Sequence, residues 1–109
     1  MNYQTLLSTI LLFFVTVSFA AAQKVRISGA IQDEEGNAVP FAQIAVFELD
    51  SETPSTGVAS DVNGKFKLKV EPGSYDLLVS YVGYEDLRME TININLSGKK
   101  FGNITIKEV

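Results

Sequence analysis

Apolar and polar side chains alternate with a period of two along most of this chain after residue 23. The pattern is clearest over residues 65–70, in which three apolar side chains alternate with Lys65, Lys67 and Lys69. Because successive side chains of a β-strand point to opposite faces, this segment is predicted to be a strand with one buried face and one solvated face.

The same pattern predicts seven strands in all, separated by turn residues such as glycine, proline and asparagine. No segment after residue 23 has an apolar stripe of helical period. Short strands at this spacing favour an all-β fold, either an antiparallel β-sandwich or a barrel. The predicted strands lie at about residues 25–32, 41–49, 57–60, 65–70, 75–82 and 92–96 and in a last segment that buries Ile104 and Ile106.

Three turns are predicted from local sequence. Asp33–Asn37 ends in Gly36 and Asn37, either of which can adopt a positive φ at little cost. Asp61–Gly64 has the composition of a hairpin turn. Glu71–Ser74 is predicted to be a type II turn, because proline occupies its second position and glycine its third.

In a sandwich built from these strands, nine apolar side chains are expected to be buried while the three lysines at 65, 67 and 69 face solvent. The strand at 41–49 carries apolar residues on both faces, which predicts that both faces are covered. The nine expected core residues are Ile27, Ile44, Val46, Phe66, Leu68, Leu77, Val79, Ile94 and Ile104.

Residues 1–22 carry no charged side chain, and an apolar run extends from Leu6 to Ala22. Three alanines at its end match the small residues at which signal peptidase cleaves. We therefore expect a helical signal peptide, residues 1–22, followed by one domain, residues 23–109. The alternative is a retained membrane anchor, because no Lys or Arg precedes the run and its length reaches the lower limit of about 17 residues for a span.

The chain contains no cysteine and no histidine, which excludes thiolate and imidazole catalysis, disulfides and Cys/His zinc sites. An exported domain without disulfides is typical of the bacterial envelope rather than of animal extracellular modules. The 13 acidic residues outnumber the 9 basic ones, for a net charge of −4. This balance argues against nucleic acid as a partner.

Two acidic segments are candidates for metal binding or catalysis, and both are interpreted as turns. Asp61, Asn63 and Gly64 match the start of a calcium loop, but lysines follow where further acidic ligands are required. Residues 33–35 are three carboxylates in a row on a glycine-containing turn, whereas acid–base pairs face each other across a substrate. We expect no catalytic residue, no metal and no cofactor.

Two sets of side chains are candidates for ligand contact. Tyr75, Tyr81 and Tyr84 could stack against a sugar or a peptide, although tyrosines of this kind more often lie in the core with the hydroxyl at its rim. The lysines at 65, 67 and 69 could bind an anionic polymer, although such a row is more often a solvated face or a guard for an edge strand.

Five segments follow one another along the chain, namely VRISGAIQD at 25–33, GNAVPFAQI at 36–44, TGVASDVNGKF at 56–66, PGSY at 72–75 and VSYVGYE at 79–85. Taken together and in this order, they resemble the carboxypeptidase regulatory-like domain, a transthyretin-like β-sandwich. The resemblance implies a seven-stranded antiparallel Greek-key sandwich without catalytic residues. It does not extend to transthyretin-like enzymes that hydrolyse a ureide, because those use histidines and a C-terminal Tyr-Arg-Gly-Ser that this chain lacks.

The resemblance is to the version of this domain at the N-terminus of TonB-dependent outer-membrane receptors in Bacteroidetes-type bacteria, where it follows a signal peptide. It implies a non-enzymatic module in the periplasm or on the periplasmic side of the outer membrane, either part of a nutrient receptor or a stand-alone relative. The implied partners are proteins of the bacterial envelope or the rest of a receptor chain, with no transmembrane span after signal cleavage. An alternative function is a secreted or surface adhesive module that binds glycan or peptide.

Overall fold

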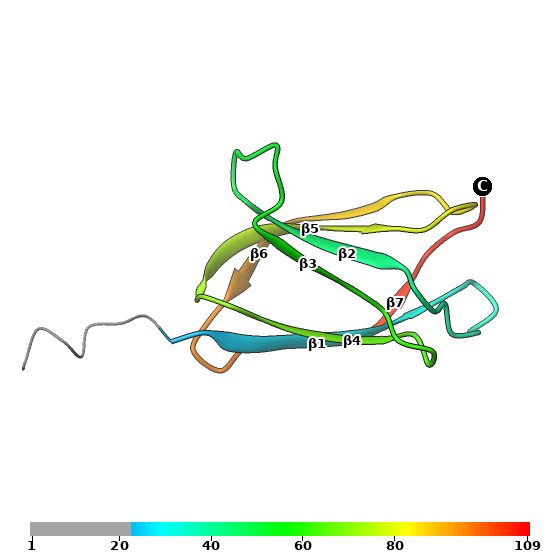
Figure 1. Cartoon of the computed structure of the whole chain (residues 1–109), viewed down its shortest axis with the longest axis horizontal. Coiled ribbons are helices and arrows are strands. Elements are labelled where there is room, and N and C mark those ends of the chain that lie inside the picture. The colour runs from blue at the N-terminus through cyan, green and yellow to red at the C-terminus, as the bar shows by residue number, and fades with distance from the viewer. Residues whose placement is uncertain (1–22) are drawn as a thin grey trace, which may run out of the picture.

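The computed structural model describes residues 23–109, which form seven β-strands in two facing sheets (Figure 1). The strands are β1 (Val25–Gln32), β2 (Gln43–Glu48), β3 (Thr56–Ala59), β4 (Lys65–Val70), β5 (Gly73–Ser80), β6 (Leu87–Ile94) and β7 (Lys99–Thr105). The three-stranded sheet has the order β4–β1–β7, and the four-stranded sheet has the order β3–β2–β5–β6. The predicted seven-stranded β-sandwich is thus confirmed. The predicted signal peptide, residues 1–22, lies outside the described residues.

One strand pair departs from the predicted antiparallel arrangement. β1 and β7 pair in parallel, from Ile27 opposite Lys99 to Gln32 opposite Thr105. The connection from β6 to β7 explains this parallel pairing. β6 belongs to the four-stranded sheet and ends near the start of β1, so β7 begins at the same end of the sandwich and runs in the same direction as β1 (Figure 1). The remaining pairs are antiparallel, as predicted.

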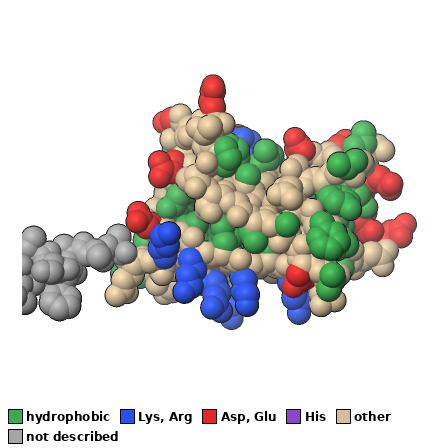
Figure 2. All heavy atoms as spheres, in the orientation of Figure 1, with side chains coloured by type: hydrophobic (Ala, Val, Ile, Leu, Met, Phe, Trp, Pro, Cys, Tyr) green, Lys and Arg blue, Asp and Glu red, His purple; other side chains and the backbone are tan. Residues whose placement is uncertain are grey.

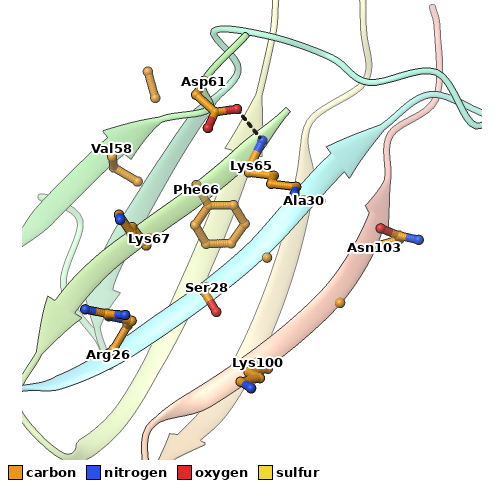
Figure 3. A pocket seen from close by; sticks show the side chains of 13 residues that line it. Arg26, Ser28, Ala30, Val58, Asp61, Lys65, Phe66, Lys67, Lys100 and Asn103 are labelled. Atoms are coloured by element: carbon orange, nitrogen blue, oxygen red, sulfur yellow. Dashed lines mark hydrogen bonds between the residues drawn. The ribbon is translucent and has the colours of Figure 1, made fainter. Parts of the chain in front are cut away.

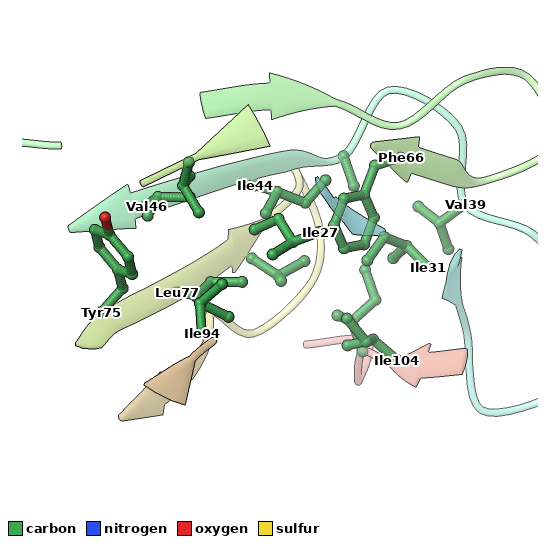
Figure 4. Close-up of a cluster of buried hydrophobic side chains, with 14 residues drawn as sticks. Ile27, Ile31, Val39, Ile44, Val46, Phe66, Tyr75, Leu77, Ile94 and Ile104 are labelled. Carbon is green, nitrogen blue, oxygen red and sulfur yellow. The ribbon is translucent and has the colours of Figure 1, made fainter. Parts of the chain in front are cut away.

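The inward-facing side chains of both sheets form one hydrophobic core (Figure 4). Eight of the nine side chains that the sequence predicts to be buried are buried. The exception, Leu68, is half-buried, because β4 is an edge strand and has a neighbour in its sheet on one side only. The three lysines of β4 are exposed, as its alternating pattern predicts. Within the described residues, every buried member of the core lies between Ile27 and Ile106, so residues 23–109 carry the seven strands and the core that joins their two sheets.

The outer face of β2 is covered less than the sequence predicts. Phe47 is only 8% exposed, because the guanidinium of Arg88 lies 5.3 Å from the centroid of its ring. Phe41 and Leu49, by contrast, are 58% and 43% exposed and lie outside the strand. The prediction that both faces are covered is therefore wrong at the two ends, because within residues 23–109 no second layer of structure packs against this side of the sheet.

Two segment boundaries also differ from the sequence prediction. Gly73 has no positive φ and already pairs with Ile94 as the first residue of β5, so residues 71–74 do not form a type II turn. β6 begins earlier than predicted and ends at Ile94, which leaves Leu96 80% exposed. In both places the pairing of β5 with β6 overrides the local pattern.

The two aspartate turns have the same architecture. In the turn after β1, Asp33 Oδ1 accepts the backbone N–H groups of Glu35 and Asn37 at 3.0 and 2.9 Å. In the turn before β4, Asp61 Oδ1 accepts those of Asn63 and Lys65, both at 2.9 Å. Each turn also contains a glycine at positive φ, Gly36 or Gly64, three positions after its aspartate. These carboxylates hold the turns together, as the turn interpretation of both acidic segments predicts.

Candidate functional site

The outward side of the three-stranded sheet carries a concentration of positive charge, which we call the basic face. All three strands contribute to it: β1 supplies Arg26, β4 supplies Lys65, Lys67 and Lys69, and β7 supplies Lys100. Figure 2 shows lysine and arginine side chains gathered along the side of the molecule that β1 and β4 form, with most of the visible acidic side chains away from it.

The strand register places these side chains on one surface. Ile27 points into the core, so Arg26 and Ser28 on either side of it point outward. Arg26 of β1 is paired with Lys69 of β4. Ser28 of β1 lies between its two partners, Lys67 of β4 and Lys100 of β7. Neighbouring strands lie about 4.8 Å apart and alternate residues of one strand about 6.8 Å apart, so the cations form a lattice of closely spaced charges.

A groove of about 720 Å³ lies on the basic face (Figure 3). Small residues line its floor, namely Ser28 and Ala30 of β1 and Gly102 of β7, and cations of β4 and β7 flank them. A second hollow of about 520 Å³ adjoins the groove and shares Arg26, Ser28 and Lys100 with it. The surface is therefore concave, with a floor of small residues between positively charged walls, and Val58, Ala59 and Phe66 add apolar atoms to its lining.

Nearby acids do not neutralise this surface. In the described part of the chain one ion pair forms, at 3.1 Å between Arg88 and Asp76, and it lies on the other sheet. Asp61 is the one acidic residue among those that line the groove, and its carboxylate already accepts two backbone N–H groups of its own turn. The cations of the basic face are thus available to an anionic ligand.

The three candidate tyrosines do not share a surface with these lysines, and none of them lines the groove. Tyr75 is 8% exposed, and its hydroxyl donates a hydrogen bond of 2.6 Å to the carbonyl oxygen of Glu71. Burial raises the pKa of Tyr75, and the carboxylates of Glu71 and Glu48 add to this effect. Tyr81 and Tyr84 are half-buried near the turn between β5 and β6, with ring centroids 5.8 Å apart.

Asp76 holds a β-bulge between β5 and β6. Its Oδ1 accepts the backbone N–H of Thr91 at 2.9 Å, and its Oδ2 accepts the Arg88 guanidinium at 3.1 Å. Thr91 has a φ of 52°, which this hydrogen bond helps to maintain. The Thr91 hydrogen bond, with a further contribution from Arg88, holds the pKa of Asp76 below its ordinary value of 3.8. The carboxylate therefore has a structural task.

Ser60 is a buried serine with both hydrogen-bonding functions used by the backbone. Its Oγ donates to the carbonyl oxygen of Val39 at 2.8 Å and accepts the N–H of Ala42 at 2.9 Å. Throughout residues 23–109, no buried side-chain nitrogen or oxygen lacks a hydrogen-bond partner, and no acidic cluster is placed to hold a metal ion. Within the same range no helix is long and apolar enough to cross a membrane.

The local sequence predicts the part of the basic face that β4 contributes, but not the parts that β1 and β7 contribute. The alternation around Ile27 was a local signal that Arg26 points outward. Lys100 and Lys67 lie on one surface because β7 pairs in parallel with β1 while β4 pairs with its other edge. The sequence around either lysine does not indicate this pairing of distant strands. The same holds for Gly102, whose place in the floor follows from a register shift between β1 and β7.

Comparison with protein families matches residues 26–107 to the carboxypeptidase regulatory-like domain. The match reaches from β1 to just beyond β7. The chain belongs to this family. Carboxypeptidase regulatory-like domains are β-sandwich modules of a regulatory rather than a catalytic type. A search of curated proteins finds no match.

Solved structures share the fold of this carboxypeptidase regulatory-like domain at low sequence identity. A chain of the type II cohesin–X-dockerin complex of Acetivibrio cellulolyticus aligns with a TM-score of 0.64 and 14% identity over 77% of this chain and 58% of that one. The 3-chlorocatechol 1,2-dioxygenase of Rhodococcus opacus 1CP aligns with 0.60 and 11% over 82% and 61%. The Bacillus anthracis TIE protein aligns with 0.58 and 20% over 79% and 17%. The chain thus spans less than two thirds of each, and these likenesses show the fold alone.

Proposed function

We propose that this chain is a non-enzymatic, exported β-sandwich module that serves as the periplasmic N-terminal domain, or as a stand-alone relative, of a TonB-dependent outer-membrane nutrient receptor. Membership of the carboxypeptidase regulatory-like family supports a non-catalytic module. The uncharged apolar segment at residues 6–22 supports export. Without histidine or cysteine, the serines and threonines of the chain have no imidazole base to activate them.

The observation that carries the proposal is the placement of the two ends of the sandwich. The chain enters β1 at one end and leaves after β7 at the other (Figure 1). The final segment is held in position, because the Glu85 N–H donates to the Lys107 carbonyl oxygen at 2.7 Å and the Val109 N–H donates to that of Gly83 at 3.0 Å. A domain that follows residue 109 would therefore attach at the end of the sandwich opposite the start of β1, an arrangement that suits a module placed ahead of a receptor plug.

The receptor assignment is tested by reading the DNA downstream of codon 109. A continuous reading frame that encodes a plug and a transmembrane barrel would support a receptor domain. A stop codon followed by an unrelated gene would contradict that version and leave the stand-alone relative.

Export is tested by expressing residues 1–109 with a C-terminal tag in a bacterium and determining the compartment and the first residue of the product. A periplasmic or outer-membrane product that begins at Gln23 would support export and cleavage. A product that keeps Met1 in the cytoplasmic membrane would indicate the retained anchor, and a cytosolic product would contradict export. Leu12→Arg, which places a charge within the apolar run, is expected to keep the chain in the cytosol, whereas Lys107→Gln is expected to leave export unchanged.

A further inference from the structure

We propose that the basic face binds an acidic polysaccharide, a linear glycan with carboxylate or sulfate groups that lies along β1 in the groove. This inference goes beyond the module function proposed above, because it assigns the outward side of the three-stranded sheet a ligand of its own.

Protection of a sheet edge does not account for the charge on this surface. The lysines of β4 and Lys100 of β7 lie on the two edge strands, but Arg26 belongs to β1, the central strand of the sheet, where no edge needs protection. Although the chain has a net charge of −4, five of its nine cationic residues belong to the basic face. These five are Arg26, Lys65, Lys67, Lys69 and Lys100, whereas the ammonium of Lys99 lies over the ring of Phe101, 5.5 Å from its centroid. Positive charge is thus concentrated on the basic face, although the protein as a whole is negatively charged.

The floor of the groove suits a sugar chain. Ser28 and Asn103 offer a hydroxyl and an amide, which donate to and accept from sugar hydroxyls. Between them the floor is low, because Ala30 and Gly102 have small or no side chains, and the position that a Cβ would take at Gly102 has no atom within 4 Å. A glycan can therefore approach the sheet closely while its acidic groups reach the cations on either side (Figure 3).

Two other polyanions fit the surface less well. An acidic peptide cannot add as a strand in the groove, because both edges of β1 are already paired with β4 and β7. A membrane surface is flat, whereas the floor of the groove is recessed between its walls. The basic face also lacks apolar anchors for a bilayer, because the large hydrophobic side chains that are exposed within residues 23–109 all lie outside β1, β4 and β7.

The proposal is tested with purified residues 23–109, titrated at low ionic strength with polygalacturonate, with dextran sulfate and with neutral dextran. We expect saturable binding to at least one of the two acidic polymers and none to neutral dextran. Binding should disappear at about 1 M salt, where the Debye length falls to about 3 Å. Equal binding to neutral dextran, or binding that is unaffected by salt, would overturn the proposal.

Two double variants with the same change in net charge locate the site. Lys67→Gln with Lys100→Gln removes a cation from each wall of the groove, and we expect affinity to fall roughly three- to twentyfold. Lys24→Gln with Lys107→Gln removes two cations that line neither hollow, and affinity should change less than about twofold. Equal losses in the two double variants would mean that net charge rather than the basic face determines binding.

A third variant tests the groove itself. Ala30→Leu fills part of the floor without changing any charge, and we expect affinity to fall at least about threefold while urea unfolding shows an intact fold. Unchanged affinity would overturn binding within the groove. Tighter binding to poly-glutamate or to vesicles that contain phosphatidylglycerol than to either acidic polysaccharide would overturn the choice of glycan in favour of a peptide or a membrane.

Discussion

The ring of Phe66 occupies the space that a side chain at residue 29 would need. Gly29 and Phe66 are partners across β1 and β4, and a Cβ at Gly29 would lie 2.8 Å from Cε1 of the ring and 3.2 Å from the carbonyl oxygen of Gly102. The ring is 4% exposed and lies 6.4 Å from that of Phe101, centroid to centroid. Glycine in the middle of this central strand is therefore explained by packing and not by a turn.

Gly29→Ala is expected to lower the free energy of unfolding by about 1–3 kcal/mol, because the added methyl group overpacks the core against Phe66. In a Phe66→Leu background the same substitution should cost less, since the smaller side chain leaves room for the methyl group. Urea unfolding of the four proteins of this double-mutant cycle measures the coupling, which should be about 0.5–3 kcal/mol. An equal cost in both backgrounds would show that the ring moves aside freely.

The alternating pattern of β4 predicts opposite outcomes at two adjacent residues. Phe66→Ala should lower the free energy of unfolding by about 3–5 kcal/mol, because it leaves a cavity in the core. Lys67→Ala should cost less than about 0.5 kcal/mol, because this side chain is exposed. Urea melts of both variants provide the measurement, and comparable losses at the two positions would contradict the assignment of faces.

The two glycines at positive φ in the aspartate turns should respond differently to alanine. Gly36 has a φ of 85° and open space around the position of a Cβ, so Gly36→Ala should cost only about 1–2 kcal/mol for the backbone conformation. At Gly64, with a φ of 78°, a Cβ would lie 2.5 Å from the carbonyl oxygen of Ile31, and Gly64→Ala should cost at least about 1 kcal/mol more. Thermal or urea unfolding compares them, and equal costs would indicate that the turn before β4 shifts to accommodate the methyl group.

Tyr75 should make stability fall at alkaline pH. Its pKa in the folded state is raised above the ordinary value of 10.0, so the unfolded chain ionises first and the folded state loses stability as the pH rises above about 10. Tyr75→Phe should remove this share of the pH dependence and cost about 0.5–1.5 kcal/mol at neutral pH, because the hydrogen bond to Glu71 is lost. Urea unfolding at several pH values tests this, with Tyr81→Phe as the control. An alkaline loss of the same size in Tyr75→Phe would assign the effect to other groups.

Asp76 should act at the other end of the pH scale. Its pKa is lowered in the folded state, so its contribution to stability is complete above the ordinary value of 3.8 and is lost as the pH falls through the lowered pKa. Asp76→Asn should therefore be less stable than the unmodified protein at neutral pH, and the difference should shrink in acid. Asp50→Asn, in an exposed loop, serves as the control. A difference that stays constant with pH would show that the charge of Asp76 does not matter.

Much of the fold and half of the candidate site were predictable because they depend on local rules. The strand that contains Phe66 and Lys67 follows from the two-residue period, which separates a buried face from a solvated one regardless of what packs against it. The turns at 33–37 and 61–64 follow from aspartate and glycine, whose hydrogen bonds and dihedral angles lie within a few residues. For these features the amino-acid sequence alone determined the outcome.

The tertiary structure decided what depends on the pairing of distant segments. The parallel register of β7 with β1 places Lys100 opposite Ser28, and thus completes the groove that the lysines of β4 begin. The pairing of β5 with β6 draws Gly73 into a strand and leaves Leu96 exposed, against their local patterns. The ring of Phe66 requires glycine at position 29. The local sequence does not determine which strands pair with each other. The pairing depends on the free energy gained when the apolar faces of the two sheets are buried against each other.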